Sequence, residues 1–312
     1  MAKRPHLSPS AIDLYLKCPE AYRRRYQEHE RIPPGIAMLR GTAYHAVAAT
    51  NFRQKLETHE DLPAADLMDQ ASEAINNARR GEWLHPAAAG DPGRAWAEAK
   101  DDTVNAAAVF AEKVAPDYQP ILVEEFIRIE IPGASHDMLG IIDLIDDQHR
   151  VSDHKTAGRA KSASDVETSL QLTFYAAAHR ARFKSDPTEV RLDVVTTGGK
   201  RQVLSSTRDR YDYARLAGIA NIVLRAIDAG IFPPAKADAW WCNQKWCGYF
   251  DTCPYVRPAP AVHEIKLPEP APEPEPAEPE PDPKDIGPPA IAVKHEKPPR
   301  SRKPKPTKPK KE

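Results

Sequence analysis

The sequence has few cysteines, no long hydrophobic run and almost no net charge. Four of the 312 residues are cysteine, and no segment approaches the ~18 consecutive apolar residues that cross a bilayer. The N-terminal residues carry charge with no apolar stretch behind it, so a secretory signal is not expected. We therefore expect a soluble cytoplasmic protein without a membrane partner. In that setting, metal binding or catalysis explains the cysteines better than disulfides do.

The near-absence of net charge excludes a protein that coats nucleic acid through bulk positive charge. Lys and Arg number 44 against 45 Asp and Glu, which gives a formal net charge of −1. A metal site and a local groove can still hold DNA at this balance. The sequence also lacks a Gly-x-x-x-x-Gly-Lys-Ser/Thr element, so the chain carries no nucleotide-driven motor of its own.

Proline is abundant but unevenly placed. More than half of the 32 prolines follow Arg257, where they alternate first with glutamate and later with lysine and arginine. Proline removes backbone donors, and little in this stretch is apolar, so packing cannot offset the loss of chain entropy. We predict a folded domain over residues 1–257 and a disordered tail over residues 258–312. The basic tip of the tail either contacts phosphate groups or is solvated without a partner.

The remaining chain changes from helical patterns to strand patterns near Pro120. Before it, we expect a helix that Ser10 caps and that ends near Cys18, and further helices at 21–27, 42–56, 64–80 and 94–114. After it, we expect strands at 121–131, 139–145, 150–156, 190–196 and 202–206, and helices at 165–183 and 209–229. This order predicts a mixed α/β fold with a central sheet flanked by helices.

Two acids stand out in the predicted sheet. Asp143 interrupts an apolar run, and a lone carboxylate there is costly unless something pairs it. If residues 146–149 form a hairpin turn, Asp153 lies beside Asp143, and Lys155 shares the face of Asp153. Two carboxylates and a lysine suit a Mg²⁺ or Mn²⁺ site that acts on a phosphodiester. The alternative is that Asp153 and Lys155 form an ordinary surface ion pair.

These residues also carry a family resemblance. Gly140-x-x-Asp143 followed by Asp153-x-Lys155 resembles the PD-(D/E)xK nuclease superfamily. The segment Leu39-Arg40-Gly41-Thr42-Ala43-Tyr44-His45 resembles the Gly-x-x-x-His element of its RecB-like branch, which includes the CRISPR-associated iron–sulfur exonucleases. Gln171-Leu172-Thr173-Phe174-Tyr175 resembles the Gln-x-x-x-Tyr element of that branch.

The resemblance implies a restriction-endonuclease-like fold and a Mg²⁺- or Mn²⁺-dependent deoxyribonuclease, with exonuclease action on single strands or ends as the usual mode. The implied metal ligands and catalytic residues are these: His45, Asp143 and Asp153 as ligands, Lys155 as the charge-stabilising group, and Gln171 and Tyr175 in support. The family often adds a glutamate from the preceding strand. Glu124 and Glu125 both qualify, and we favour Glu124. His45 and Tyr175 could instead be packing residues.

The four cysteines are Cys18, near the N-terminus, and Cys242, Cys247 and Cys253. Four thiolates suit zinc or an iron–sulfur cluster. One distant cysteine followed by three near the end of the domain resembles the iron–sulfur clasp of the same branch, which implies a [4Fe–4S] cluster, with zinc as the alternative. Family members often have two residues between the first two C-terminal cysteines, and here there are four.

Two other functions are compatible with these motifs. The chain could be a non-cleaving DNA-binding or assembly subunit of a recombination or repair complex that retains the fold. It could also cut only alongside a helicase, a recombinase or another repair protein, which the proline-rich tail would contact. The tripeptide Arg23-Arg24-Arg25 beside Cys18 either lines a DNA channel or forms a solvated helix face.

Overall fold

The computed structural model of the protein describes residues 4–81 and 91–256. The predicted tail over 258–312, and its boundary with the folded domain, lie outside the described residues. None of the helices in the described part of the chain combines the length and the apolar character that crossing a bilayer requires.

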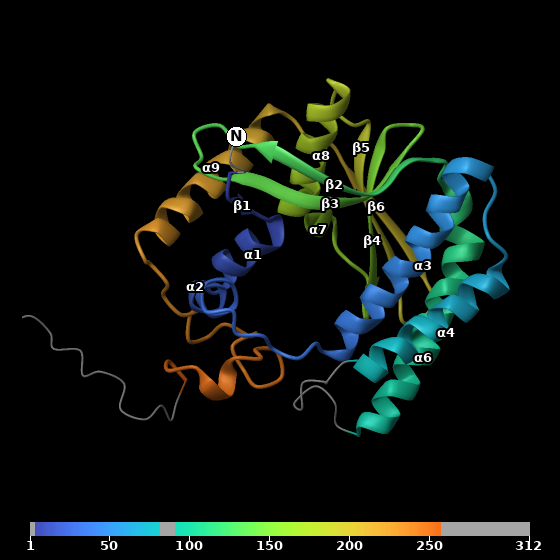
Figure 1. Cartoon of the computed structure of the whole chain (residues 1–312), viewed down its shortest axis with the longest axis horizontal. Helices are drawn as coiled ribbons and strands as arrows, with labels where there is room; N and C mark the ends of the chain where they lie inside the picture. Colours follow the sequence, from blue (N-terminus) through green and yellow to red (C-terminus); the bar gives the residue numbers. More distant parts are fainter. Residues whose placement is uncertain (1–3, 82–90, 257–312) are drawn as a thin grey trace, which may run out of the picture. The chain divides into compact units, whose positions relative to one another are not determined.

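Six strands of the described chain form one mixed sheet, which confirms the predicted α/β class (Figure 1). The strands are β1 (His6–Leu7), β2 (Pro120–Glu130), β3 (Asp137–Asp146), β4 (Arg150–Ala157), β5 (Glu189–Thr196) and β6 (Arg201–Ser206). The order is β1-β3-β4-β5-β6, and β2 pairs with β3. The pairs β1/β3 and β4/β5 are parallel, and the other pairs are antiparallel.

One edge of β3 is shared by two short pairings. Because β2 follows the other edge along most of β3, both β1 and β4 must pair with the remaining edge. There β1 reaches Met138, and β4 begins to pair at Leu144. Among the described strands, none pairs with residues 139–143 on this edge. Asp143 therefore lies where the sheet opens between β1 and β4.

Helices cover both faces of the sheet and divide the core in two. On one face, α1 (Pro9–Lys17), α8 (Leu170–Phe183) and α9 (Arg210–Asp228) pack on residues such as Ile142 and Val151. On the other face, α3 (Ile36–Thr58), α4 (Ala64–Gly81), α6 (Pro92–Val109) and a π-helical turn (Phe110–Val114) enclose Leu144. Figure 1 shows α3, α4 and α6 together on one side of the strands.

Three helix boundaries differ from the prediction. Helix α1 is capped by Ser8 rather than Ser10, because Pro9 occupies the first turn and the Ser8 hydroxyl accepts a hydrogen bond from the Ala11 N–H. Helix α3 begins at Ile36, well before the predicted start at 42. The helix predicted at 165–183 is two helices, α7 (Ala163–Glu167) and α8, since Ser169 caps a new start.

The segment that joins α1 to α3 does not present a free arginine row. Helix α2 (Pro19–Tyr22) continues into a π-helical turn (Arg23–Gln27). Arg23 forms ion pairs with Glu20 and Glu28. Arg24 is buried and its guanidinium binds Glu30. Only Arg25 of the three is exposed, so the predicted DNA-channel role does not fit Arg23 and Arg24.

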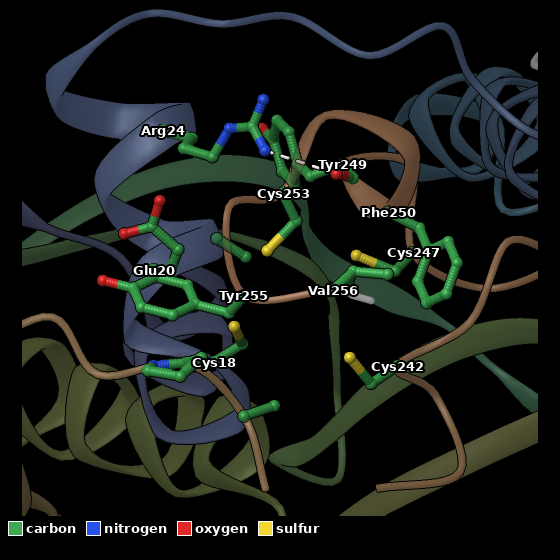
Figure 2. A pocket seen from close by; sticks show the side chains of 13 residues that line it. Cys18, Glu20, Arg24, Cys242, Cys247, Tyr249, Phe250, Cys253, Tyr255 and Val256 are labelled. Atoms are coloured by element: carbon green, nitrogen blue, oxygen red, sulfur yellow. Dashed lines mark hydrogen bonds between the residues drawn. The ribbon is translucent and has the colours of Figure 1, made fainter. Parts of the chain in front are cut away.

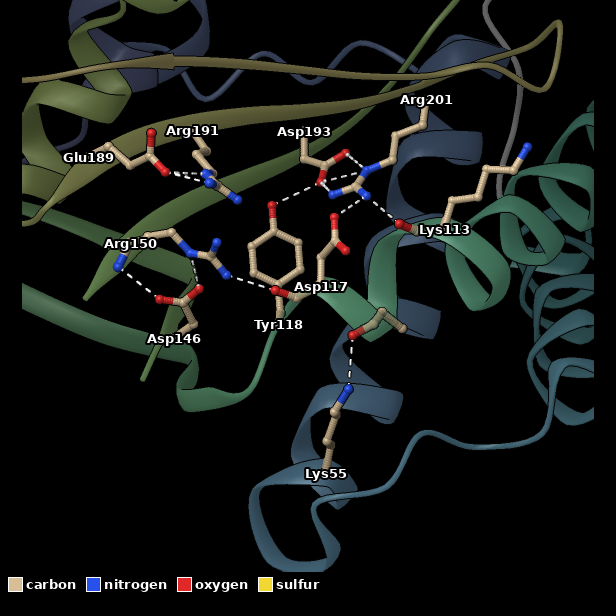
Figure 3. A network of polar contacts seen from close by, with 11 residues as sticks. Lys55, Lys113, Asp117, Tyr118, Asp146, Arg150, Glu189, Arg191, Asp193 and Arg201 are labelled. Atoms are coloured by element: carbon tan, nitrogen blue, oxygen red, sulfur yellow. Dashed lines mark hydrogen bonds and ion pairs between the residues drawn. The ribbon is translucent and has the colours of Figure 1, made fainter. Parts of the chain in front are cut away.

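A buried polar network joins the helical layer to β5 and β6 (Figure 3). The Tyr118 hydroxyl donates to Asp193 Oδ2 at 2.9 Å, and Arg201 Nη2 lies 2.7 Å from the same oxygen. Arg201 also pairs with Asp117, in the 3₁₀ turn Ala115–Asp117, and the Lys55 ammonium of α3 donates to the Ala115 carbonyl at 2.9 Å. These contacts fix α3 against the sheet and so fix the position of His45.

Candidate active site and cysteine cluster

The β2/β3 ladder is interrupted at one level. Val123 pairs with Leu144 and Glu125 with Ile142, but Glu124 and Asp143, which face each other in this register, are not paired. Glu124 has φ +48, a left-handed conformation that is unfavourable for a residue with a side chain. Strand β3 also changes the face that it buries at this level. Ile142 packs in the core under α8, whereas Leu144, two residues later, packs in the core under α3. Such strain is concentrated at functional sites.

Three predicted metal ligands meet at this interruption. His45 Nδ1, on α3, lies 3.4 Å from Asp143 Oδ2 and 4.0 Å from Glu124 Oε1. One ligand atom from each of the three residues lies within 4.8 Å of the others. Glu125 instead pairs with Arg182 of α8. The geometry thus separates the two candidate glutamates and brings Glu124 to His45 and Asp143.

Asp153 and Lys155 lie across the opening, on β4. The two side chains share a face, as their spacing predicts, and Lys155 Nζ lies 2.9 Å from Asp153 Oδ1. Asp153 is buried. The His154 N–H donates to Asp143 Oδ2 at 3.0 Å, which ties the Asp143 carboxylate to β4 where the strands part. Asp143 and Asp153 are therefore neighbours, as the hairpin predicts.

Two residues of α8, Gln171 and Tyr175, connect Lys155 on β4 with Asp143 on β3. The Lys155 ammonium donates to Gln171 Oε1 at 3.5 Å, and Gln171 Nε2 donates to the Tyr175 hydroxyl at 2.7 Å. That hydroxyl donates to Asp143 Oδ1 at 3.3 Å. The Tyr175 hydroxyl and the His154 N–H each donate to one oxygen of Asp143, and hydrogen bonds of this kind favour the carboxylate form that binds a cation.

Close packing brings α8 to this position. A Cβ atom on Gly140 would lie 2.6 Å from Cε1 of Phe174, which is closer than carbon atoms approach. Glycine at 140 therefore lets α8 pack directly on β3 and places Tyr175 within reach of Asp143. This gives a physical reason for the glycine in the Gly-x-x-Asp element.

Crowded acids make the site electrostatically unusual. Burial raises the pKa of Asp143 to about 6 and that of Asp153 to about 7, even though Lys155 opposes both shifts. Burial also raises the pKa of Glu124. Burial, followed by the charge of Lys155, lowers the pKa of His45, which keeps the imidazole neutral and able to bind a metal. Carboxylate oxygens and one imidazole nitrogen form a donor set that fits Mg²⁺ or Mn²⁺.

The site opens into a cleft of about 440 Å³. The cleft is lined by predicted site residues: His45, Asp143, Lys155, Gln171 and Tyr175. It is also lined by residues that sequence reasoning missed. These are Ser8, Pro9 and Ser10 at the start of α1, and an apolar floor of Phe126, Leu139, Gly140 and Ile141. A phenylalanine in a strand is normally expected in the core. In β2, however, Phe126 alternates with Ile127 and Ile129, which pack on the core, and shares its face with Arg128 and Glu130, so this pattern could have indicated its exposure.

The four cysteines converge as predicted. Cys18 lies at the junction of α1 and α2, and Cys242, Cys247 and Cys253 follow α9. All four line one cavity and none forms a disulfide (Figure 2). Burial raises the pKa of Cys247, and the charges of the other three cysteines raise it further. We call these four residues the cysteine cluster.

The surroundings of the cysteine cluster hold the two ends of the domain together. The buried Arg24 guanidinium donates to the Tyr249 carbonyl at 3.3 Å and stacks over the Tyr249 ring at 4.7 Å. The Tyr249 hydroxyl donates to the Glu30 carbonyl at 3.0 Å. The Glu20 N–H donates to the Pro233 carbonyl at 3.2 Å. Arg24 thus has a structural role beside the cysteine cluster.

Comparison with known proteins agrees with this architecture. No curated protein matches the sequence. A protein from Eubacterium rectale that its name describes as a candidate exonuclease shares the fold with a TM-score of 0.50 and 10% identity, over 83% of this chain and 91% of that chain. The protein SSO0001 aligns with a TM-score of 0.39 and 15% identity, over 81% of this chain and 88% of that chain.

The sequence profile of the PD-(D/E)XK nuclease superfamily matches residues 6–254, which span β1 to the last cysteine. The match covers both the opened sheet with its acidic site and the cysteine cluster. The mixed sheet flanked by helices is the restriction-endonuclease-like fold that the sequence motifs predicted. The chain belongs to the PD-(D/E)XK nuclease superfamily.

Proposed function

We propose that the protein is a metal-dependent DNA nuclease of the RecB-like branch that acts as an exonuclease on single strands or ends. The observation that carries this proposal is the meeting of His45, Glu124 and Asp143 with the Asp153–Lys155 pair at the opening of the sheet. The pairing of a metal-type donor set with an adjacent, partly exposed ammonium favours cleavage over simple binding.

We further propose that His45, Glu124 and Asp143, whose ligand atoms lie within 4.8 Å of one another, hold Mg²⁺ or Mn²⁺, and that Asp153, which lies outside this group on β4, is a further ligand. When bound, the cation would supply Lewis-acid stabilisation of charge on a phosphodiester. The protein's contribution is to hold the ligands in place. The backbone of His154 and the hydroxyl of Tyr175 each bind one oxygen of Asp143, which leaves the carboxylate little rotational freedom.

Lys155 is assigned to charge stabilisation rather than to proton abstraction. Burial alone would lower the pKa of its ammonium, but the charges of Asp153 and Asp143 outweigh burial and raise it. The group therefore stays protonated at neutral pH and can stabilise negative charge that develops on phosphoryl oxygens. Gln171 positions the ammonium through its amide oxygen, and Tyr175 completes the link to Asp143.

The decisive test is cleavage of end-labelled single-stranded and double-stranded DNA, with an RNA of the same sequence as comparison. We expect cleavage with Mn²⁺ or Mg²⁺ and none after EDTA treatment, with activity restored when the metal is returned. Release of mononucleotides or short products from one end would support exonuclease action. A protein that binds these oligonucleotides tightly but leaves all of them intact would instead be the non-cleaving subunit.

We also propose that the cysteine cluster binds a [4Fe–4S] cluster with a structural role in a reducing, cytoplasmic setting. A zinc ion with Zn–S bonds of about 2.3 Å would hold its four sulfurs roughly 4 Å apart. Among the described residues, the group of three or more metal-binding side chains with ligand atoms within 4.8 Å is His45, Glu124 and Asp143, and it contains no cysteine. The wider spacing of the cysteine sulfurs supports a larger, multi-atom cofactor.

Anaerobic purification tests this assignment. We expect about four iron atoms per protein and the broad visible absorbance of an iron–sulfur cluster. Cys247→Ser should lower both to background and make the segment after α9 sensitive to protease, because the link between Cys18 and the C-terminal cysteines is lost. Lys245→Ala, an exposed substitution in the same segment, serves as the control and should change neither. Stoichiometric zinc without iron in the wild type would overturn the proposal.

A further inference from the structure

Two large apolar side chains are exposed beside the acidic site. Phe126 on β2 is 57% exposed and Ile141 on β3 is 47% exposed, and the two residues are direct cross-strand partners. Full burial of a phenylalanine or isoleucine side chain stabilises a fold by about 1.5–3 kcal/mol. This pair lies in the middle of its ladder rather than at a loop, so its exposure leaves a flat apolar surface in the sheet. We call Phe126 and Ile141 the apolar shelf.

The apolar shelf belongs to the active-site cleft. Both residues line the same cavity as His45, Asp143 and Lys155. Phe126 follows Glu124 by two positions, and Ile141 precedes Asp143 by two, so the shelf lies roughly 7 Å along the strands from the carboxylates. This separation suits a ligand whose phosphate would bind a cation held by the acidic site and whose flat apolar group lies next to that phosphate.

We propose that Phe126, supported by Ile141, stacks on an unpaired base adjacent to the phosphate held at the acidic site. This inference rests on the proposed nuclease function and names the substrate feature that the cleft recognises. An aromatic ring can stack on any base, so the contact does not select sequence. A base inside a duplex is already covered on both faces, so the shelf selects single strands or unpaired ends. Phe126 is a positioning residue in this scheme.

The experiment measures binding of fluorescein-labelled oligonucleotides by anisotropy, with Ca²⁺ in place of Mn²⁺. Each oligonucleotide carries either normal bases or one abasic site, moved position by position from the end. For the wild type, one abasic position should weaken binding by about 5- to 150-fold, which is the range of one base–aromatic stack. Phe126→Ala should weaken binding of the normal oligonucleotide by a similar factor and should no longer respond to that abasic site.

Phe126→Trp should restore the response to the abasic site, whereas a residue with a merely structural role would not give base-dependent rescue. Tyr211→Ala on α9 is the matched control, because Tyr211 is 66% exposed and does not line the cleft. Its affinity and abasic response should equal those of the wild type. Equal sensitivity of the wild type and Phe126→Ala to every abasic position would overturn the inference.

Cleavage with Mn²⁺ is scored separately in the same preparations. Wild-type protein that shows the Phe126-dependent stacking signal but cuts no oligonucleotide would contradict the proposed nuclease function and leave the shelf supported. Protein that cuts DNA but shows no position at which base removal and Phe126→Ala are coupled would support the nuclease and overturn the shelf.

Discussion

Replacing Lys155 by alanine is expected to lower kcat for DNA cleavage by about 100- to 1000-fold, the usual cost of removing one preorganised charge-stabilising donor. Lys155 Nζ lies 2.9 Å from Asp153 and 3.5 Å from Gln171, so the ammonium is held in place before substrate arrives. Its charge acts mainly on the transition state, because negative charge on the phosphoryl oxygens increases there. The loss should therefore fall on kcat more than on KM.

The fold should survive the substitution. The Lys155 side chain is 36% exposed, and its removal leaves the core under α8 intact. The matched control is Lys200→Ala, an exposed lysine in the turn between β5 and β6, which should keep wild-type kcat. Circular dichroism and thermal unfolding report folding for both variants. If Lys155→Ala cleaves as fast as Lys200→Ala, Lys155 has no role in the reaction and its pairing with Asp153 is structural.

Lys155→Arg provides a further distinction. The guanidinium keeps the positive charge but is larger and planar, and it cannot reproduce the position of a compact ammonium between Asp153 and Gln171. We expect Lys155→Arg to recover only part of the lost kcat. Full recovery would mean that the charge alone matters and that the contact with Gln171 is dispensable.

The acidic pair could be predicted from sequence because a short connection fixes it. Residues 146–149 form a hairpin turn, and the β3/β4 pairing of Leu144 with Ser152 places Asp143 opposite Asp153. The alternation of side chains then puts Lys155 beside Asp153. Local geometry determines all of these relations, and the family resemblance adds only their role.

Glu124 could not be assigned in the same way. Regular alternation places Glu124 and Glu125 on opposite faces but does not say which face carries the site. The structure replaces regular alternation with a left-handed residue at Glu124, which switches the inward face at that level. Sequence patterns do not record such a local inversion.

The longest-range features were predicted only by resemblance. Convergence of Cys18 with the three C-terminal cysteines depends on how α1, α2 and the segment after α9 pack, which spacing alone does not determine. The arginine run beside Cys18 shows the opposite case. Its composition allowed a DNA channel, but Arg24 is buried and binds Glu30, six residues further on, and the Tyr249 carbonyl, 225 residues away, and composition indicates neither contact.

Asp153→Asn is expected to stabilise the metal-free protein at pH 8 while abolishing its response to metal. Burial raises the pKa of Asp153 to about 7 from an ordinary value of 3.8, so the folded state binds this proton more tightly than the unfolded state. Between about pH 4 and pH 7, the free energy of unfolding therefore falls as pH rises. At pH 8 the buried carboxylate is ionised, and its removal should raise the free energy of unfolding by on the order of 1–3 kcal/mol.

Chemical denaturation in EDTA at pH 5 and pH 8 measures this effect. The advantage of Asp153→Asn should be largest at pH 8 and should shrink at pH 5, where Asp153 in the wild type is protonated. The matched control is Asp193→Asn in the network of Figure 3, a buried aspartate that binds Arg201 and Tyr118. This substitution breaks a charged hydrogen bond and should cost about 1.5–3 kcal/mol. A loss of stability in both variants would contradict the assignment of Asp153 as a strained ligand.

Added Mn²⁺ should cancel most or all of the stability advantage of Asp153→Asn over the wild type. A cation that binds only the folded state stabilises it, by about 2.7 kcal/mol at a hundredfold excess over Kd. The wild type should gain this at pH 8 and much less at pH 5, since protons compete for the same oxygens. Asp153→Asn should gain little at either pH, and Asp193→Asn should gain as much as the wild type. Because replacing Asp153, unlike replacing Asp193, should remove both the instability without metal and the gain with metal, the buried acids are best understood as groups held in place for a cation.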